Sequence, residues 1–119
     1  MANQKVKGFK RIINACFFSI AGFKAIWEHE EAFRQEVLLF LLATPLALWL
    51  TENNIERVLL IGSVGAVLLV ELLNSAVETA IDRIGLERHE LSGRAKDMGS
   101  AAVTLSLALA AMTWALILI

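Results

Sequence analysis

Residues 58–82 read VLLIGSVGAVLLVELLNSAVETAID, and this stretch decides the fold. Its first half is apolar except for Ser63, whereas its second half carries a series of polar residues: Glu71, Asn74, Ser75, Glu78 and Asp82. An α-helix rises about 1.5 Å per residue, so roughly 20 mainly apolar residues cross the hydrocarbon core of a bilayer. We therefore predict a transmembrane helix over residues 55–84 whose last turns present polar side chains.

Residues 31–50 predict another membrane span. Between residues 37 and 50 only Thr44 and Pro45 interrupt an otherwise apolar run. Proline lacks an amide hydrogen and clashes with the preceding turn, so Pro45 is expected to kink this helix near one end.

A third span is predicted over residues 92–119, because the chain carries no charge after Asp97. Glycine favours the C-terminal ends of helices and serine favours their N-caps. Gly85 is therefore expected to end the preceding helix, and Ser92 is expected to cap this one.

The composition agrees with an all-α membrane protein that forms a single domain over residues 1–119. Hydrophobic residues make up 57% of the chain and charged residues 19%, against about 45–50% and about 25% in soluble domains. A core of this size could not hide so much apolar surface from water, so lipid is the expected solvent. The formal net charge of -1 gives no electrostatic reason for a nucleic-acid partner, and the lone Cys16 excludes an intramolecular disulfide.

Residues 5–27 precede the spans and are predicted to form an amphipathic helix. Their apolar side chains recur at helical spacing, at Phe9, Ile12, Ile13, Cys16, Ile20, Phe23 and Trp27. Lys10, Arg11 and Asn14 lie off this stripe. We expect the helix to lie on the membrane surface, although packing on the ends of the chain's own helices is an alternative that can coexist with this placement.

The distribution of basic residues predicts the orientation. Lysine and arginine cluster in two places: in the N-terminal region up to the start of the first span, at Lys5, Lys7, Lys10, Arg11, Lys24 and Arg34, and around the loop between the second and third spans, at Arg83, Arg88, Arg94 and Lys96. The other loop holds only Arg57, and the C-terminus holds none. Because basic loops stay in the cytoplasm, the N-terminus is expected to be cytoplasmic and the C-terminus to lie outside.

The polar residues of 71–82 fall on one helix face and carry the chemical signal. A carboxylate at membrane depth is unfavourable by about 2.5–3.5 kcal/mol and is usually paired or functional. One reading is a salt-bridge seam with Arg94 and Lys96, and the other is a hydrated pocket for a hard divalent cation such as Mg²⁺. A second polar stripe, on the third span, could face the first: Gly93, Lys96, Asp97, Ser100 and Thr104.

Three motifs closely resemble those of the bacterial integral-membrane diacylglycerol kinase family. They are AFRQE at residues 32–36, ELLNSAVE at 71–78 followed by Asp82-Arg83, and HELSGRAKDMGSA at 89–101. The resemblance covers nearly the whole chain. It implies a homotrimeric helical bundle in the bacterial inner membrane, with active sites shared between subunits. It also implies transfer of the γ-phosphoryl group of ATP, with Mg²⁺, to the primary hydroxyl of diacylglycerol.

The resemblance assigns roles residue by residue. Glu71 would be the general base, and Glu30 and Glu78 would hold the metal. Further positions match those around the nucleotide: Arg11, Phe18, Asn74, Glu87, Arg88, His89, Lys96 and Asp97. Arg11, Glu36, Ser100 and Trp114, together with Glu71, match positions on the lipid side. Phe18 and Arg88 stand where tyrosines are usual in the family, so contacts there would lack a phenol hydroxyl.

Two alternatives stay open at this point. Polyprenol kinases share much of the same motif set, so the lipid acceptor could be a polyprenol. A non-catalytic membrane protein with a cation pathway lined by Glu71, Glu78 and Asp82 would be a different class. Release of ADP that depends on both MgATP and added lipid distinguishes a kinase from such a pathway.

Overall fold

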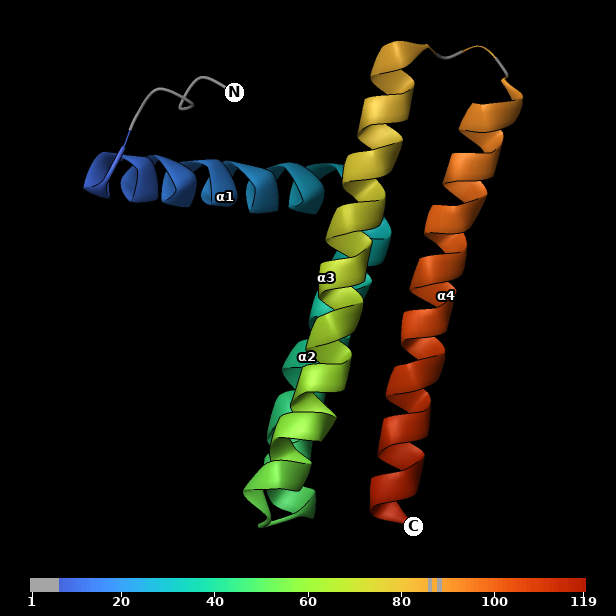
Figure 1. Cartoon of the computed structure of the whole chain (residues 1–119). Coiled ribbons are helices and arrows are strands. Elements are labelled where there is room, and N and C mark those ends of the chain that lie inside the picture. Colours follow the sequence, from blue (N-terminus) through green and yellow to red (C-terminus); the bar gives the residue numbers. More distant parts are fainter. Residues whose placement is uncertain (1–6, 86, 88) are drawn as a thin grey trace. The chain divides into compact units, whose positions relative to one another are not determined.

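The computed structural model describes residues 7–85, 87 and 89–119, and within these ranges the regular structure is entirely helical. The helices are α1 (Phe9–His29), α2 (Glu31–Leu50), α3 (Asn54–Ile84) and α4 (Glu90–Leu118), as Figure 1 shows. Helices α2, α3 and α4 are long and apolar enough to cross a membrane. The prediction of an all-helical chain with three candidate spans is thus confirmed.

The chain divides into two compact units, residues 1–31 and 32–119, and α1 makes up most of the first. Gly8 precedes α1 with a φ of 68°, a left-handed conformation that glycine adopts without strain. Glu30 follows the helix with extended backbone, and its amide donates to the Ile26 carbonyl at 2.9 Å. Residues 5 and 6 of the predicted surface helix lie outside the described residues.

In the second unit, α3 and α4 run antiparallel and pack along each other (Figure 1). The buried face of α3 repeats every three or four residues, at Leu60, Val64 and Val67, and continues to Glu71 and Ser75. The side chains buried on the other two helices of this unit are mostly small: Phe33, Ala43 and Ala47 on α2, and Ser106 and Ala110 on α4. Small residues let helix backbones approach closely, which is how helices commonly associate in lipid.

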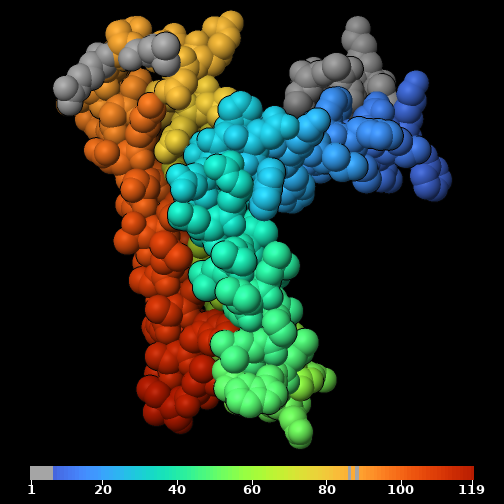
Figure 2. Space-filling view, turned by 180° about the vertical axis from the view of Figure 1, so that it is seen from behind, coloured from blue at the N-terminus to red at the C-terminus, as the bar shows by residue number. Residues whose placement is uncertain are grey.

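Large apolar side chains cover the outside of this unit. Leu41, Leu42, Leu105 and Leu116 are each at least 60% exposed. The space-filling view in Figure 2 shows α2 and α4 side by side on one face. A surface of this kind suits hydrocarbon as its solvent, in agreement with a membrane protein.

Polar side chains hold the turn between α2 and α3. The Asn53 side-chain oxygen accepts from two amides in the first turn of α3, at 2.9 and 3.1 Å. Arg57 reaches back to α2, where its Nε donates to the Thr51 carbonyl and its Nη2 to the Leu48 carbonyl, both at 2.8 Å. The end of α2 is therefore capped by a guanidinium from the next helix.

Of the two helix ends predicted from the sequence, one agrees with the structure and one does not. Gly85 ends α3 as expected, with its amide donating to Ile81, but with φ near 180° rather than left-handed. The prediction that Ser92 caps α4 is wrong, because α4 begins at Glu90 and is capped by His89. The His89 Nδ1 accepts from the Leu91 amide at 3.0 Å, so the helix starts before Ser92 is reached.

Candidate functional site

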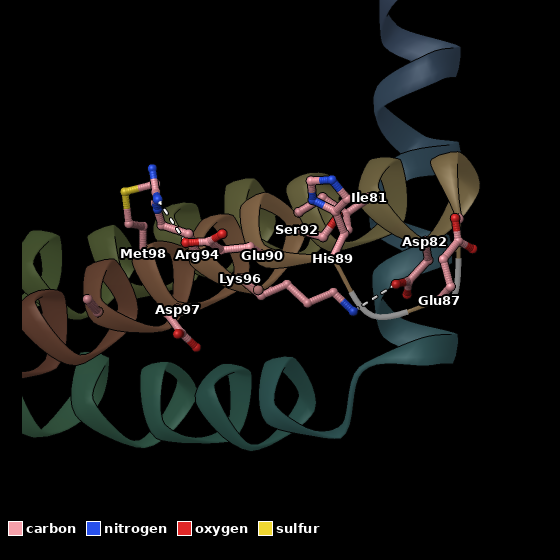
Figure 3. Close-up of a pocket in the computed structure, with 13 residues that line it drawn as sticks. Ile81, Asp82, Glu87, His89, Glu90, Ser92, Arg94, Lys96, Asp97 and Met98 are labelled. Atoms are coloured by element: carbon pink, nitrogen blue, oxygen red, sulfur yellow. Dashed lines mark hydrogen bonds and ion pairs between the residues drawn. The ribbon is translucent and has the colours of Figure 1, made fainter.

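A cleft of about 790 Å³ lies between α3 and α4 at the end where Gly85 closes α3. Helix α3, helix α4 and the segment joining them all contribute to its lining (Figure 3). Four of the predicted nucleotide residues line it: Glu87, His89, Lys96 and Asp97. Arg88, which was predicted with them, lies outside the described residues.

An ion pair joins the two helices inside this cleft. The Lys96 Nζ lies 2.8 Å from the Asp82 Oδ1, and the two side chains are 44% and 49% exposed. Arg94 pairs within its own helix, with Glu90 at 3.7 Å. The predicted salt-bridge seam is therefore present through one pair, and the exposed side of the Lys96 ammonium keeps the capacity to contact a phosphate oxygen.

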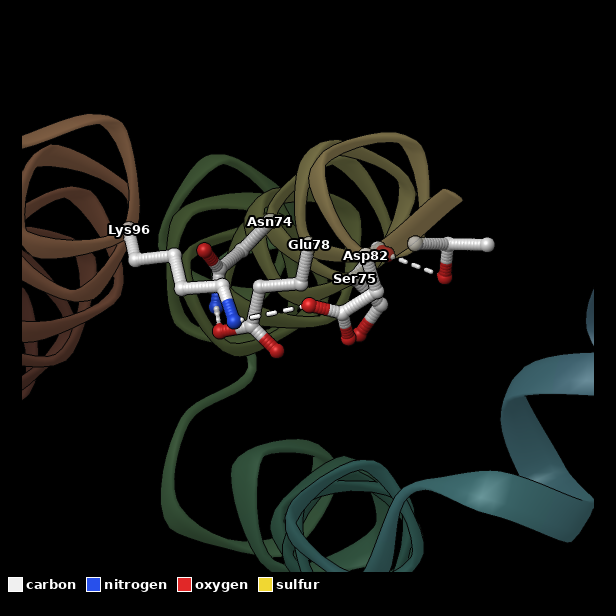
Figure 4. Close-up of polar contacts among 6 residues, drawn as sticks. Asn74, Ser75, Glu78, Asp82 and Lys96 are labelled. Atoms are coloured by element: carbon white, nitrogen blue, oxygen red, sulfur yellow. Dashed lines mark hydrogen bonds and ion pairs between the residues drawn. The ribbon is translucent and has the colours of Figure 1, made fainter. Parts of the chain in front are cut away.

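Glu78 lies beside this ion pair on the same face of α3 (Figure 4). Its Oε1 accepts from the Asn74 Nδ2 at 3.4 Å. The Lys96 ammonium is close enough to attract the Glu78 carboxylate as well. Glu78, Asn74 and Lys96 thus form one connected polar group between the helices.

A second polar group lies deeper along α3. Glu71 and Ser75 are only 5% and 7% exposed, and the Glu36 carboxyl of α2 contacts that of Glu71. The Glu36 Oε1 and the Ser75 Oγ are buried and have no hydrogen-bond partner among the described residues. Because Glu71 precedes Glu78 by two helical turns, about 10 Å separates the two carboxylates along the helix axis.

The remaining predicted residues lie elsewhere. Ser100 is exposed on α4. Trp114 borders an apolar groove of about 380 Å³ between α2, α3 and α4, and its indole donates to the Leu60 carbonyl at 3.0 Å. Arg11, Phe18 and Glu30 belong to the first unit.

The donor chemistry around Glu78 fits Mg²⁺. The described residues gather no group of three or more histidine, cysteine, aspartate or glutamate side chains suited to hold a metal alone. Mg²⁺ needs fewer protein ligands, because it usually binds through one or two carboxylates and completes its shell with phosphate oxygens and water. Glu78 supplies one such carboxylate.

Comparison with known proteins identifies the family. The family model described as prokaryotic diacylglycerol kinase matches residues 17–118. The chain belongs to this family. It is 55% identical to the diacylglycerol kinase of Escherichia coli K12 over 118 residues, which are 99% of this chain and 96% of that protein. The diacylglycerol kinase of Pseudomonas aeruginosa is 51% identical over 94% of this chain and 91% of its own, and that of Haemophilus influenzae is 49% identical over 92% and 93%.

The structure adds two contacts that the sequence analysis missed. Glu36 had been assigned only to the lipid side, whereas its carboxyl contacts Glu71. Gly99 had no role, yet its α-carbon lies directly against the Asn74 side chain. Gly99 follows Lys96 by three residues, so helical spacing would have placed it near the α4 stripe.

Proposed function

We propose that this chain is a membrane-bound kinase that transfers the γ-phosphoryl group of ATP, with Mg²⁺, to the primary hydroxyl of diacylglycerol, giving phosphatidate. Its membership in the diacylglycerol kinase family supports this activity. The structural observation that carries the mechanism is the polar face of α3. This face holds a buried carboxylate, Glu71, two turns from the carboxylate of Glu78 beside the Lys96 ammonium.

The cleft end of this face would hold the nucleotide. Lys96 provides a point charge for phosphate oxygens, and Asp97, Glu87 and His89 line the same cleft. Arg11, Phe18 and Arg88 are assigned to the nucleotide by resemblance. Glu78 and Glu30 would hold Mg²⁺, which, when bound, neutralises charge on the β- and γ-phosphates.

The deeper end of this face would receive the lipid hydroxyl. Glu71 would accept the proton of the lipid hydroxyl. The hydroxyl oxygen would at the same time attack the γ-phosphorus, in line with the departing ADP. The neighbouring Glu36 would fix the Glu71 carboxyl, and Ser100 and Trp114 are assigned to the lipid side. Since phosphoryl transfer depends mainly on positioning and charge neutralisation, such a site needs no glycine-rich nucleotide loop.

Several copies of this chain would assemble in the bacterial inner membrane. Ser100 and Thr104 are exposed on the part of α4 that carries no charge, so a neighbouring chain is the natural cover for them in lipid. We assign a homotrimer with active sites shared between subunits. The exposed Phe9, Phe17 and Ile20 of α1, with Lys10 and Arg11, suit a helix on the cytoplasmic membrane surface.

The direct test is lipid phosphorylation by the purified chain. Detergent micelles containing dioctanoylglycerol or a polyprenol are incubated with Mg²⁺ and ATP labelled at the γ-phosphate, and the lipid products are separated. We expect label in phosphatidate, dependent on Mg²⁺. Label only in polyprenol phosphate would refute the assigned acceptor, and an absence of labelled lipid with folded protein would refute the kinase activity.

A further inference from the structure

Gly99 on α4 meets Asn74 on α3 where the two helices pack. A Cβ atom built on Gly99 would overlap the Asn74 Oδ1 and approach its Cγ to 3.1 Å, whereas the Asn74 Cβ would lie at an ordinary 3.9 Å. The crowding therefore comes only from the end of the amide. Any residue other than glycine at position 99 would displace the amide of Asn74.

The Asn74 amide has a defined place in the site. Its Nδ2 donates to the Glu78 Oε1 at 3.4 Å, and Figure 4 shows the two side chains lying toward each other. Its Oδ1 is buried and has no conventional hydrogen-bond partner among the described residues. This oxygen lies over the bare α-carbon of Gly99, a Cα–H···O contact of the kind that recurs at helix interfaces.

We infer that Gly99 is a positioning residue for Glu78: its missing side chain makes the space in which the Asn74 amide holds the Glu78 carboxylate. The inference rests on the proposed role of Glu78 as a metal ligand. Groups that orient a metal ligand through a hydrogen bond typically change metal affinity 10- to 100-fold when they are lost. Gly99 would affect the metal ligand Glu78 indirectly, through the position of the Asn74 amide.

Binding of Mn²⁺ as a probe for Mg²⁺ tests this inference without turnover. The full-length protein in detergent is titrated with Mn²⁺ in the presence of β,γ-methylene-ATP, and free Mn²⁺ is measured by electron paramagnetic resonance. We expect Gly99→Ala and Asn74→Ala each to weaken binding about tenfold. The double variant should bind no more weakly than Asn74→Ala alone, because the new methyl group then has nothing to displace.

Gly62→Ala is the matched control. Gly62 lies within α3, and a Cβ there meets no atom within 4 Å, so this variant adds the same methyl group without a clash. Its Mn²⁺ affinity should equal that of the unaltered protein. If Gly99→Ala fails to fold, the double variant should restore folding, since it removes the amide that collides.

The outcomes separate this inference from the proposed function. If Glu78→Gln weakens Mn²⁺ binding but Gly99→Ala behaves like Gly62→Ala, Gly99 has no positioning role and the proposed function stands. Additive losses in the double variant, or its failure to fold, would also overturn the inference. If Glu78→Gln itself binds Mn²⁺ normally, the metal assignment of the proposed function fails and the inference fails with it.

Discussion

Replacement of Arg57 by methionine should destabilise the membrane helices while leaving the chemistry intact. Arg57 lies near the start of α3, and its guanidinium donates to the carbonyls of Leu48 and Thr51 at 2.8 Å. Methionine keeps most of the length of the side chain but removes both donors. The two carbonyls at the C-terminal end of α2 then lose their charged partner.

The two contacts set the size of the effect. A hydrogen bond that involves a charged group contributes about 1.5–3 kcal/mol to stability. The carbonyls lie at the end of a candidate span, where water can partly replace the lost donors, so the two bonds together should contribute at most about 3 kcal/mol, which is twice the lower limit. We expect a loss of about 2–3 kcal/mol in the free energy of unfolding, which is roughly 30- to 150-fold in the unfolding constant.

This loss can be measured by reversible unfolding in mixed micelles. The fraction of sodium dodecyl sulfate is increased, and the helicity of the protein is followed by circular dichroism. Arg57→Lys is the graded control, because an ammonium is a compact donor that lacks the planar fork of a guanidinium and should recover only part of the stability. The initial rate per folded molecule should stay unchanged, since Glu71 lies about 20 Å farther along α3. If Arg57→Met is as stable as the unaltered protein, the capping argument is wrong.

Three further outcomes follow from the proposed site. Glu71→Gln should lower lipid phosphorylation by at least about 10²-fold while the protein stays folded, and a near-normal rate would remove Glu71 as the base. Glu30→Gln and Glu78→Gln should each raise the Mg²⁺ concentration needed for half-maximal rate, whereas unchanged titrations in both variants would make these acids structural. Glu71→Gln chains mixed and reassembled with Glu30→Gln chains should regain activity in proportion to random mixing. The absence of recovery in oligomers shown by cross-linking to be mixed would contradict shared active sites.

The helices were predictable because their apolar runs are long and each interruption is short. Composition and length identify α2, α3 and α4 as candidate spans without knowledge of their packing. The start of α4 was harder to predict, because serine is a preferred N-cap residue and Ser92 lies only two residues after Glu90, where the helix begins. A histidine ring nitrogen fills the cap position that serine more commonly fills, and only the geometry shows this.

For the site, the sequence predicted which residues share a face of one helix, but not which residues lie opposite that face. Helical spacing placed Glu71, Asn74 and Glu78 on one face of α3, and the structure brings Asn74 and Glu78 together. Which residues oppose that face depends on the packing of three helices. The contacts of Glu36 with Glu71 and of Gly99 with Asn74 are therefore seen only in the folded structure.

The bond between the Trp114 indole and the Leu60 carbonyl provides a built-in optical reporter. The chain has three tryptophans, and Trp49 is 80% exposed whereas Trp114 is partly buried and engaged at 3.0 Å. With Trp27 and Trp49 replaced by phenylalanine, a single fluorophore remains at the junction of α3 and α4. Its emission spectrum and quenching then follow the docking of these two helices in real time, in any lipid or detergent and without an attached dye.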